Sequence, residues 1–329
     1  MKPKVLMLVS DNKMGGIKST VDAICTSQLT EKFEFIVSPT DTVKQILSSL
    51  QPSVIIFKTA CNWKNLPKLL SLKLLNRQTK LIIQDHHYSG GFEQYNVSSL
   101  SRFHLMLKLS YGLADRVVAV SQGQSEWMQQ NRLISPEKLT VIESSNVLEK
   151  FFAVDPKPAK RPLILGAYGR FGVQKGFDVL LKAMKLVSPA EVELHLGGEG
   201  PLEAELKQLA QGLDNVKFLG RIDDVPSFLQ QCDAVVIPSR WEPWGIVCLE
   251  AKAAGKPVIV SDVDGLSEQV HNCGILVPPG DPVKLAVAIA SLSTQDLETW
   301  GKAGRESVKN AWQKYLVKLE ALIGEIVES

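Results

Sequence analysis

The chain has 329 residues, of which 45% are hydrophobic, and a formal net charge of +2 at pH 7. This length and hydrophobic content predict two domains, each large enough to bury its own core. A charge this close to neutral provides no broad basic field, which argues against a nucleic-acid partner. No apolar run approaches the ~20 residues that span a bilayer, and the N-terminal apolar run is too short for a signal peptide. We therefore expect a cytoplasmic protein, and its five cysteines, which show no C-x-x-C spacing, are expected to be buried and reduced.

Short strands rich in Val, Ile and Leu alternate with helices, which is typical of parallel sheets covered by helices on both faces. The predicted strands are 5–9, 33–37, 54–57, 80–84, 116–120 and 139–143 in the first half, and 163–167, 191–196, 216–219, 234–237, 257–261 and 274–277 in the second half. Residues 154–162 contain three prolines and no apolar periodicity, so they predict a linker. We expect domains over 1–155 and 156–309, each an α/β, doubly wound sheet that binds ligands at the carboxyl ends of its strands.

The first strand leads into a loop that ends in Gly15 and Gly16, followed by a predicted helix. Two adjacent glycines let the backbone approach a ligand closely. Lys18 and Ser19 resemble the end of a Walker A motif, but residues 12 and 17 are not glycine, and no G-x-G-x-x-G pattern is present. The loop therefore favours neither a P-loop kinase nor a dinucleotide-binding enzyme.

A polar run, Asp85 to Gly91, follows the predicted strand 80–84. Its histidines, His86 and His87, can hydrogen-bond a hydroxyl group or move a proton near neutral pH. The alternative is a pair of loop histidines that are held by backbone groups. A metal site beginning at Asp85 and His87 lacks a third ligand with suitable spacing.

Residues 166–176 read as the end of a strand, a basic loop and the start of a helix. The loop contains no acidic residue, so Arg170 and Lys175 are expected to have no neutralising neighbour other than a ligand anion. Arginine offers a planar fork that suits phosphate oxygens, and lysine offers a compact charge. The alternative is that both are ordinary solvated cations.

The most informative stretch is 240–250, which places Glu242 in a loop and Glu250 inside a helix that begins near Gly245. The unpaired N–H groups of a helix N-terminus suit an anion, so the backbone of residues 245–247 is a candidate diphosphate site. The two carboxylates are then expected to be free to accept hydrogen bonds from sugar hydroxyls. This combination favours a ligand that has a sugar, a diphosphate and a ribose in series.

These segments resemble the retaining GT-B glycosyltransferases of family 4. The family's E-x7-E motif matches Glu242 and Glu250, and its G-R…K-G loop matches residues 169–176. The resemblance implies two Rossmann-like domains that face a central cleft, with the amphipathic segment 310–329 crossing back to the N-terminal domain. It implies transfer of a hexosyl group from a UDP-, GDP- or ADP-sugar to a saccharide or a lipid-linked saccharide in cell-surface glycan synthesis.

The resemblance also implies roles for individual residues. Glu242 and His86 would contact the transferred sugar, with His87 as the alternative to His86. Arg170 and Lys175 would neutralise the departing diphosphate. Glu250 would bind the ribose. The implied donor-binding set is Gly15, Gly16, Gly169, Arg170, Lys175, Arg221, Ile222, Trp244, Gly245, Ile246, Val247 and Glu250.

Asp262-Val-Asp264 looks like the D-x-D metal clamp of the other glycosyltransferase architecture. The surrounding residues instead resemble the family 4 segment that follows the E-x7-E helix, in which glycine is common at the position of Asp264. We therefore expect no metal cofactor, because the basic loop and the helix dipole supply the positive charge.

Residues 63–80 and 102–109 mix apolar and basic side chains. One interpretation is a membrane-surface helix, which favours a lipid-linked acceptor and a peripheral location at the inner face of the membrane. The other is a set of core helices with snorkelling lysines.

Two further hypotheses remain for the function. A GT-B nucleotide-sugar epimerase or glycan phosphorylase keeps the fold and changes the reaction. A non-catalytic subunit that binds a nucleotide sugar keeps the site without turnover.

Overall fold

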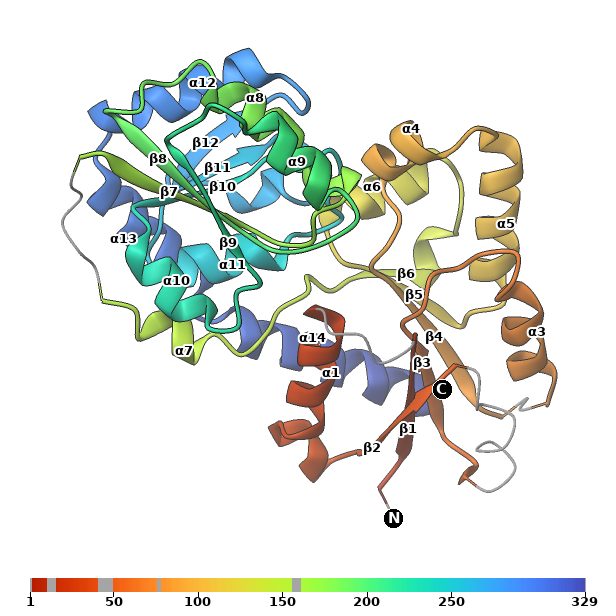
Figure 1. Cartoon of the computed structure of the whole chain (residues 1–329). Coiled ribbons are helices and arrows are strands. Elements are labelled where there is room, and N and C mark those ends of the chain that lie inside the picture. The colour runs from red at the N-terminus through yellow and green to blue at the C-terminus, as the bar shows by residue number, and fades with distance from the viewer. Residues whose placement is uncertain (1, 11–15, 41–49, 76–77, 156–160, 329) are drawn as a thin grey trace. The chain divides into compact units, whose positions relative to one another are not determined.

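The computed structural model describes residues 2–10, 16–40, 50–75, 78–155 and 161–328. By its internal contacts the chain divides into two compact units (Figure 1). The first unit comprises Met1–Val147 together with Ala311–Ser329, and the second comprises Leu148–Asn310. Among the described residues, no helix combines the length and the hydropathy that a bilayer crossing requires.

The first unit is built on a parallel sheet with the strand order β2-β1-β3-β4-β5-β6. The strands are β1 (Lys4–Val9), β2 (Glu34–Pro39), β3 (Val54–Phe57), β4 (Lys80–Asp85), β5 (Arg116–Ala119) and β6 (Leu139–Val141). All six strands predicted in this half are present. Strand β1 pairs with both β2 and β3, so the chain changes direction across the sheet between β1 and β3. In doubly wound sheets this switch point is where ligands bind.

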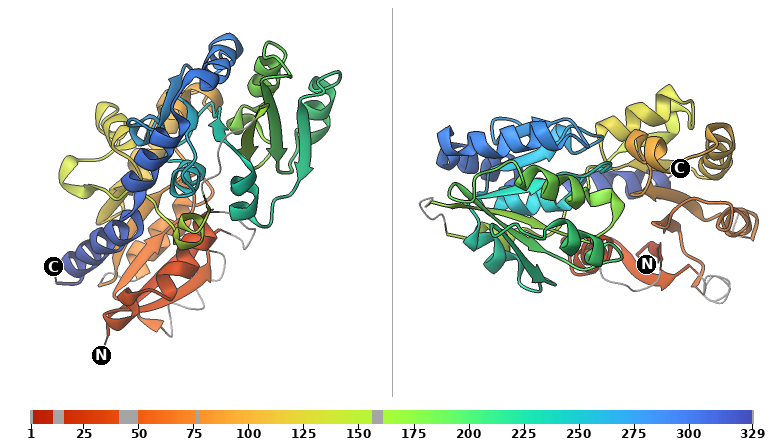
Figure 2. Two further views of the ribbon diagram at one scale, coloured as in Figure 1. Left: turned by 90° about the vertical axis from the view of Figure 1, so that its left-hand side faces the viewer. Right: turned by 45° about the horizontal axis from the view of Figure 1, so that its top comes forward.

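Helices cover both faces of this sheet. They include α1 (Gly16–Cys25), α3 (Leu66–Leu75), α4 (Gly90–Asn96), α5 (Leu100–Gly112), α6 (Gln122–Gln130) and the C-terminal α14 (Ala311–Glu328). The apolar stripe of α14, which includes Leu319 and Ile323, is buried against Val5 and Met7 of β1. Figure 2 shows this last helix, in dark blue, beside the red and orange strands of the unit. The end of the chain therefore completes the core at its beginning.

The second unit contains a parallel sheet with the strand order β12-β11-β10-β7-β8-β9. The strands are β7 (Leu163–Tyr168), β8 (Val192–Gly197), β9 (Val216–Gly220), β10 (Ala234–Ile237), β11 (Val258–Ser261) and β12 (Gly274–Val277). Numbered within the unit, the order is 3-2-1-4-5-6, which is the Rossmann order. Its switch point lies between β7 and β10, which pair directly.

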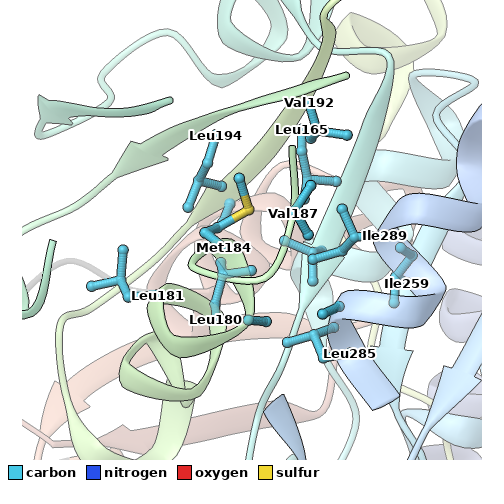
Figure 3. Close-up of a cluster of buried hydrophobic side chains, with 14 of the residues drawn as sticks. Leu165, Leu180, Leu181, Met184, Val187, Val192, Leu194, Ile259, Leu285 and Ile289 are labelled. Carbon is cyan, nitrogen blue, oxygen red and sulfur yellow. The ribbon is translucent and has the colours of Figure 1, made fainter. Parts of the chain in front are cut away.

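The core of the second unit forms where helices pack on this sheet (Figure 3). Leu180 and Met184 of α8 and Ile289 of α12 meet Leu165 and Leu194 of the sheet. Burial of each such side chain contributes about 1.5–3 kcal/mol to folding. The helices are α7 (Glu149–Phe152), α8 (Phe177–Met184), α9 (Glu203–Leu209), α10 (Val225–Gln231), α11 (Ile246–Ala253), α12 (Pro282–Ser291) and α13 (Leu297–Val308).

Two details differ from the sequence-based expectations. Residues 148–155 pack in the second unit, where Phe151 is buried and the Arg305 guanidinium donates a hydrogen bond to the Val154 carbonyl at 2.7 Å. Four cysteines are buried as expected, but Cys25 is half-buried, because it ends α1.

Candidate active site

Two loops of the second unit meet at its switch point. One follows β7 and the other follows β10. The Arg240 N–H donates to the Gln174 carbonyl at 2.8 Å, and the Gln174 side chain donates to the Trp241 carbonyl at 3.2 Å. The Arg240 guanidinium also binds both carboxylate oxygens of Asp178, at 2.8 and 2.7 Å. This bidentate contact fixes the two loops against each other and against the start of α8.

Gly176 is required where these loops touch. Its φ of +64° is left-handed, and a Cβ atom placed there would lie 2.0 Å from the Pro238 carbonyl oxygen. Only glycine avoids both penalties. The close approach brings Lys175, at the end of a short 3-10 turn, next to the loop that carries Glu242.

Lys175 and Glu242 form the central contact of the site. The Lys175 Nζ lies 2.5 Å from Oε2 of Glu242, and the Ser239 hydroxyl donates to the same oxygen at 3.2 Å. The side chains are only 19% and 11% exposed. The expectation that Lys175 has no neutralising neighbour is therefore wrong. The partner is supplied by a residue 67 positions away, which the local composition of the loop could not reveal.

Arg170 behaves as predicted from its loop. It is exposed, and in the described part of the chain no carboxylate lies within ion-pair distance of its guanidinium. Gly169 precedes it with a φ of +145°. The Gly169 carbonyl lies so close to Gly198 that a Cβ on Gly198 would sit 2.0 Å from its oxygen. The positive φ of Gly169 and its close approach to Gly198 therefore fix the backbone that precedes Arg170.

Glu250 lies on α11 and accepts a hydrogen bond from the Tyr168 hydroxyl at 2.8 Å. Burial raises the pKa of Glu250, and the bond from Tyr168 partly offsets this effect. Burial also raises the pKa of Tyr168 well above its usual value, so the phenol stays protonated and donates. Both carboxylates thus already contact protein donors, Lys175 at Glu242 and Tyr168 at Glu250, and each keeps further acceptor positions for a hydroxyl.

The N-terminus of α11 begins after Gly245, whose φ is +97°, and no side chain caps it. This left-handed φ disfavours a larger residue, and a Cβ on Gly245 would also lie 2.9 Å from the Leu266 side chain, which would have to shift. The helix starts at Ile246, as predicted, so the first N–H groups of α11 include those of Ile246 and Val247. Trp244 adds an indole Nε1 that is buried without a hydrogen-bond partner among the described residues. These groups form a set of donors that suits an oxygen-rich anion.

Arg221 and Ile222 follow β9 in the same unit. The Arg221 Nε contacts Asp223 at 2.8 Å on the surface. Ile222 lies over Gly197 at the end of β8, where a Cβ would come within 2.4 Å of its side chain. These two residues of the implied donor-binding set follow a strand that is two strands away from β7 in the sheet order.

The histidine loop belongs to the first unit and is organised by Asp85. Its carboxylate accepts the backbone N–H groups of His87 and Tyr88 at 2.7 and 3.1 Å, and the Tyr111 hydroxyl at 2.6 Å. The His86 Nδ1 lies 3.3 Å from the Ser144 hydroxyl, and the Nε2 atoms of both histidines are buried without a partner among the described residues. Burial, together with nearby Lys58 and His87, holds the pKa of His86 well below its usual value. His86 is thus a neutral imidazole at pH 7.

Gly16 begins α1, whereas Gly15 lies outside the described residues. The sequence reasoning missed Lys58, which directly follows β3 at the switch point of the first unit. Lys58 is 1% exposed, and its ammonium group donates to the Gln84 amide oxygen. Burial lowers its pKa to about 7. A lysine directly after a buried apolar strand was the available signal.

The two aspartates of the D-x-D pattern lie in different environments. Asp262 is exposed, whereas the Asp264 carboxylate accepts the Glu242 backbone N–H at 2.9 Å. Among the residues that the structure describes, no group of three or more His, Cys, Asp or Glu side chains is arranged to hold a metal ion. Asp264 is therefore a structural partner of the Glu242 loop.

Comparison with known proteins agrees with this geometry. Residues 162–295 match the family of glycosyl transferases group 1. An uncharacterized glycosyltransferase of Methanocaldococcus jannaschii is 34% identical over 214 residues, which are 61% of this chain and 50% of that protein. A phosphatidyl-myo-inositol mannosyltransferase of Mycobacterium leprae is 36% identical over 164 residues, which are 47% of this chain and 43% of that protein.

The fold is also that of known structures. Anabaena HepE, in a crystal structure with UDP and glucose, has a TM-score of 0.75 to this chain at 21% identity, covering 99% of this chain and 100% of that one. The chain spans about half the length of the curated relatives it matches. The two parallel sheets, their strand orders and the similar structures show that the chain has the GT-B fold, and its residues 162–295 match the glycosyl transferases group 1.

Proposed function

We propose that the protein is a retaining glycosyltransferase that moves a hexosyl group from a nucleoside-diphosphate sugar to a saccharide or lipid-linked saccharide acceptor in cell-surface glycan synthesis. The single observation that carries the proposal is the Lys175–Glu242 pair at the switch point of the second unit. A cation for phosphate and a carboxylate for sugar hydroxyls stand side by side there. Helix α11 begins at Ile246, four residues after Glu242.

The chemistry follows from where charge develops. As the bond between the sugar and the diphosphate breaks, negative charge builds on the leaving phosphate. Arg170, Lys175 and the α11 N-terminus supply the positive charge that stabilises this developing charge. Glu242 then holds the sugar hydroxyls, and Glu250 holds the ribose. His86, as a neutral imidazole, donates or accepts one hydrogen bond to the transferred sugar and carries no positive charge.

The donor is a uridine diphosphate sugar in this proposal, because HepE, which has the same fold, was crystallised with UDP. No divalent ion is needed, because the arginine, the lysine and the helix dipole together supply the positive charge. Retention is explained by attack on the same face of the sugar as the departing phosphate.

The acceptor side is assigned to the first unit through an apolar surface on α3 and α5, the α3–α5 patch. It consists of the exposed residues Trp63, Leu70, Leu74, Leu105 and Leu109 together with Lys64, Arg102 and Lys108. The Arg102 guanidinium lies 5.8 Å from the centre of the Trp63 ring. Apolar side chains with interspersed cations suit an anionic lipid surface. The mannosyltransferase of M. leprae, whose name includes a phosphatidylinositol, is in keeping with a lipid-linked acceptor and a peripheral, cytoplasmic location.

A thermal-shift experiment tests the donor assignment. The protein is heated with UDP-glucose, UDP-galactose, GDP-mannose or ADP-glucose, with and without Mg²⁺, because a ligand that binds the folded state raises its apparent stability. We expect a magnesium-independent shift with the UDP-sugars, lost in Arg170→Ala and retained in Lys185→Ala, an exposed lysine on the same unit. Absence of a shift with every donor refutes the proposal.

Product analysis separates the alternative reactions. An epimerase converts the donor without an acceptor, and a phosphorylase releases a sugar phosphate when inorganic phosphate is supplied. A non-catalytic binding subunit shows the thermal shift but neither hydrolysis nor transfer with any acceptor.

A further inference from the structure

The short segment 264–269, which follows β11, makes hydrogen bonds to the loop that carries Glu242 at two points: at Glu242 itself and just before the start of α11. Strands β10 and β11 are parallel neighbours, with Val235 paired to Val258 and Ile237 to Val260. Their carboxyl ends therefore lie side by side, and the loops that follow them are adjacent.

Asp264 makes the contact at Glu242. Its Oδ2 accepts the Glu242 N–H at 2.9 Å. It is also the first central residue of a turn that is closed by the bond from the Leu266 N–H to the Val263 carbonyl at 3.0 Å. Its φ of +44° is a conformation that favours Gly, Asn or Asp. Aspartate is thus one of the few residues that fit this backbone and still supply an acceptor for Glu242.

Gln269 makes the contact just before the start of α11. It is 3% exposed, and its amide Nε2 donates to the Trp244 carbonyl at 2.5 Å and to the Gly245 carbonyl at 3.3 Å. Its own backbone carbonyl accepts the buried Lys252 ammonium at 2.8 Å. Within a trans peptide the C=O and N–H groups point in opposite directions. With both carbonyls turned toward Gln269, the N–H groups of Gly245 and Ile246 point the other way.

We propose that Asp264 and Gln269 are positioning residues for the donor site: Asp264 sets the backbone from which the Glu242 carboxylate reaches the sugar, and Gln269 orients the N–H groups at the start of α11 toward the diphosphate. This inference rests on the proposed function. It gives the second aspartate of the Asp262-Val-Asp264 pattern a role that involves no metal. The two residues act on different parts of the donor, so their variants are distinguishable.

The Asp264 arm compares three variants in the full-length protein. Asp264→Gly keeps the turn and removes the acceptor, Asp264→Asn keeps both, and Asp262→Asn changes the exposed neighbouring carboxylate as a matched control. Because a small misplacement of a reacting group is costly, we expect Asp264→Gly to lower kcat by about 10- to 100-fold with UDP affinity unchanged. Asp264→Asn should stay within about threefold of the wild type, as for a neutral replacement of one hydrogen bond.

The Gln269 arm uses Gln269→Met, which keeps the length of the side chain and removes the donor. UDP affinity, measured by calorimetry, should fall by about 5- to 10-fold, which is the effect expected from loss of a well-oriented anion contact. Amide hydrogen exchange should show faster exchange of the Glu242 N–H in Asp264→Gly only.

The outcomes distinguish a failure of the proposed function from a failure of the positioning roles of Asp264 and Gln269. If the wild type binds no nucleotide and turns over no donor, the proposed function fails, and the roles of Asp264 and Gln269 fail with it. If the wild type is active and Asp264→Gly is equally active, or Asp262→Asn loses as much activity as Asp264→Gly, the positioning role of Asp264 is wrong while the proposed function stands. An unchanged UDP affinity in Gln269→Met overturns the role of Gln269.

Discussion

Lys175 and Glu242 lie 67 positions apart in the chain and form an ion pair, with 2.5 Å between Nζ and Oε2. The sequence predicts that Lys175 binds phosphate and that Glu242 binds sugar. The pair keeps both groups in place while neither is bound to a ligand. In the proposed function, a nucleotide sugar that uses both residues shares or displaces this contact through its phosphate and its hydroxyls. The charge of the Lys175 ammonium group is therefore already balanced by Glu242. The diphosphate of the donor competes with Glu242 for Lys175, and the sugar hydroxyls compete with Lys175 for Glu242.

Glu242→Gln should bind UDP more tightly than the wild type while transferring less sugar. The amide leaves Lys175 free for the diphosphate, and a partly exposed ion pair of this kind is worth up to about 1 kcal/mol, so the gain in affinity is at most about fivefold. The measurement is calorimetry with UDP, alongside turnover of the UDP-sugar, with Asp262→Asn as the control. Weaker UDP binding in Glu242→Gln would mean that the pair does not compete with the ligand.

Lys58→Met should be more stable than the wild type, and the gain should shrink as the pH rises. Burial lowers the pKa of Lys58 from 10.5 to about 7. Between these values the unfolded chain holds the proton that the folded protein has released, so the stability contributed by Lys58 rises with pH. Below pH 7 the folded protein carries the full penalty of a buried ammonium group, and the variant gains most there.

Melting temperatures of the wild type and Lys58→Met, compared from about pH 6 to about pH 9, measure this difference. Lys314→Met, at an exposed lysine of the same unit, is the control and should show no such trend. A gain that is constant across this range would contradict the role of the buried charge.

Gly176→Ala should destabilise the second unit, whereas Gly172→Ala in the same loop should not. At position 176 the new methyl group meets the Pro238 carbonyl at 2.0 Å in a left-handed backbone, which costs about 2 kcal/mol or more. At position 172 the backbone is extended, and nothing lies within 4 Å of the added Cβ. Urea unfolding of the two variants provides the comparison, and equal stabilities would show that the two loops separate easily at this contact.

The α3–α5 patch should bind vesicles that contain anionic phospholipid, and this binding should weaken as salt screens the charges. The double variant Leu105→Glu and Leu109→Glu places carboxylates on two half-exposed positions of α5 and should abolish co-sedimentation with the vesicles. The same change at Val283 and Val287, two exposed valines of α12 in the other unit, is the matched control. Equal loss in both double variants would point to a general charge effect and against the patch.

Much of the fold was predictable from local patterns. All twelve strands were predicted from short apolar runs, and the central ones such as 54–57 and 234–237 are continuously apolar because both of their faces are buried. The position of Glu242 in a loop and of Glu250 inside a helix follows from Pro243 and Gly245, which end one element and start the next. Spacing and composition also mark Arg170 as a basic residue without a local acidic partner.

The contacts between these local pieces were decided by the tertiary structure. The pairing of β7 with β10 brings Lys175 to Glu242, and the pairing of β10 with β11 brings Asp264 to the Glu242 backbone. A sequence window does not contain the order of strands in a sheet, so it shows Lys175 as unpaired and gives no partner for Asp264. The sequence by itself determined which segments are strands, helices and polar loops, because these depend on neighbouring residues. Only the packing of distant strands decided which charges meet, because an ion pair depends on distance in space.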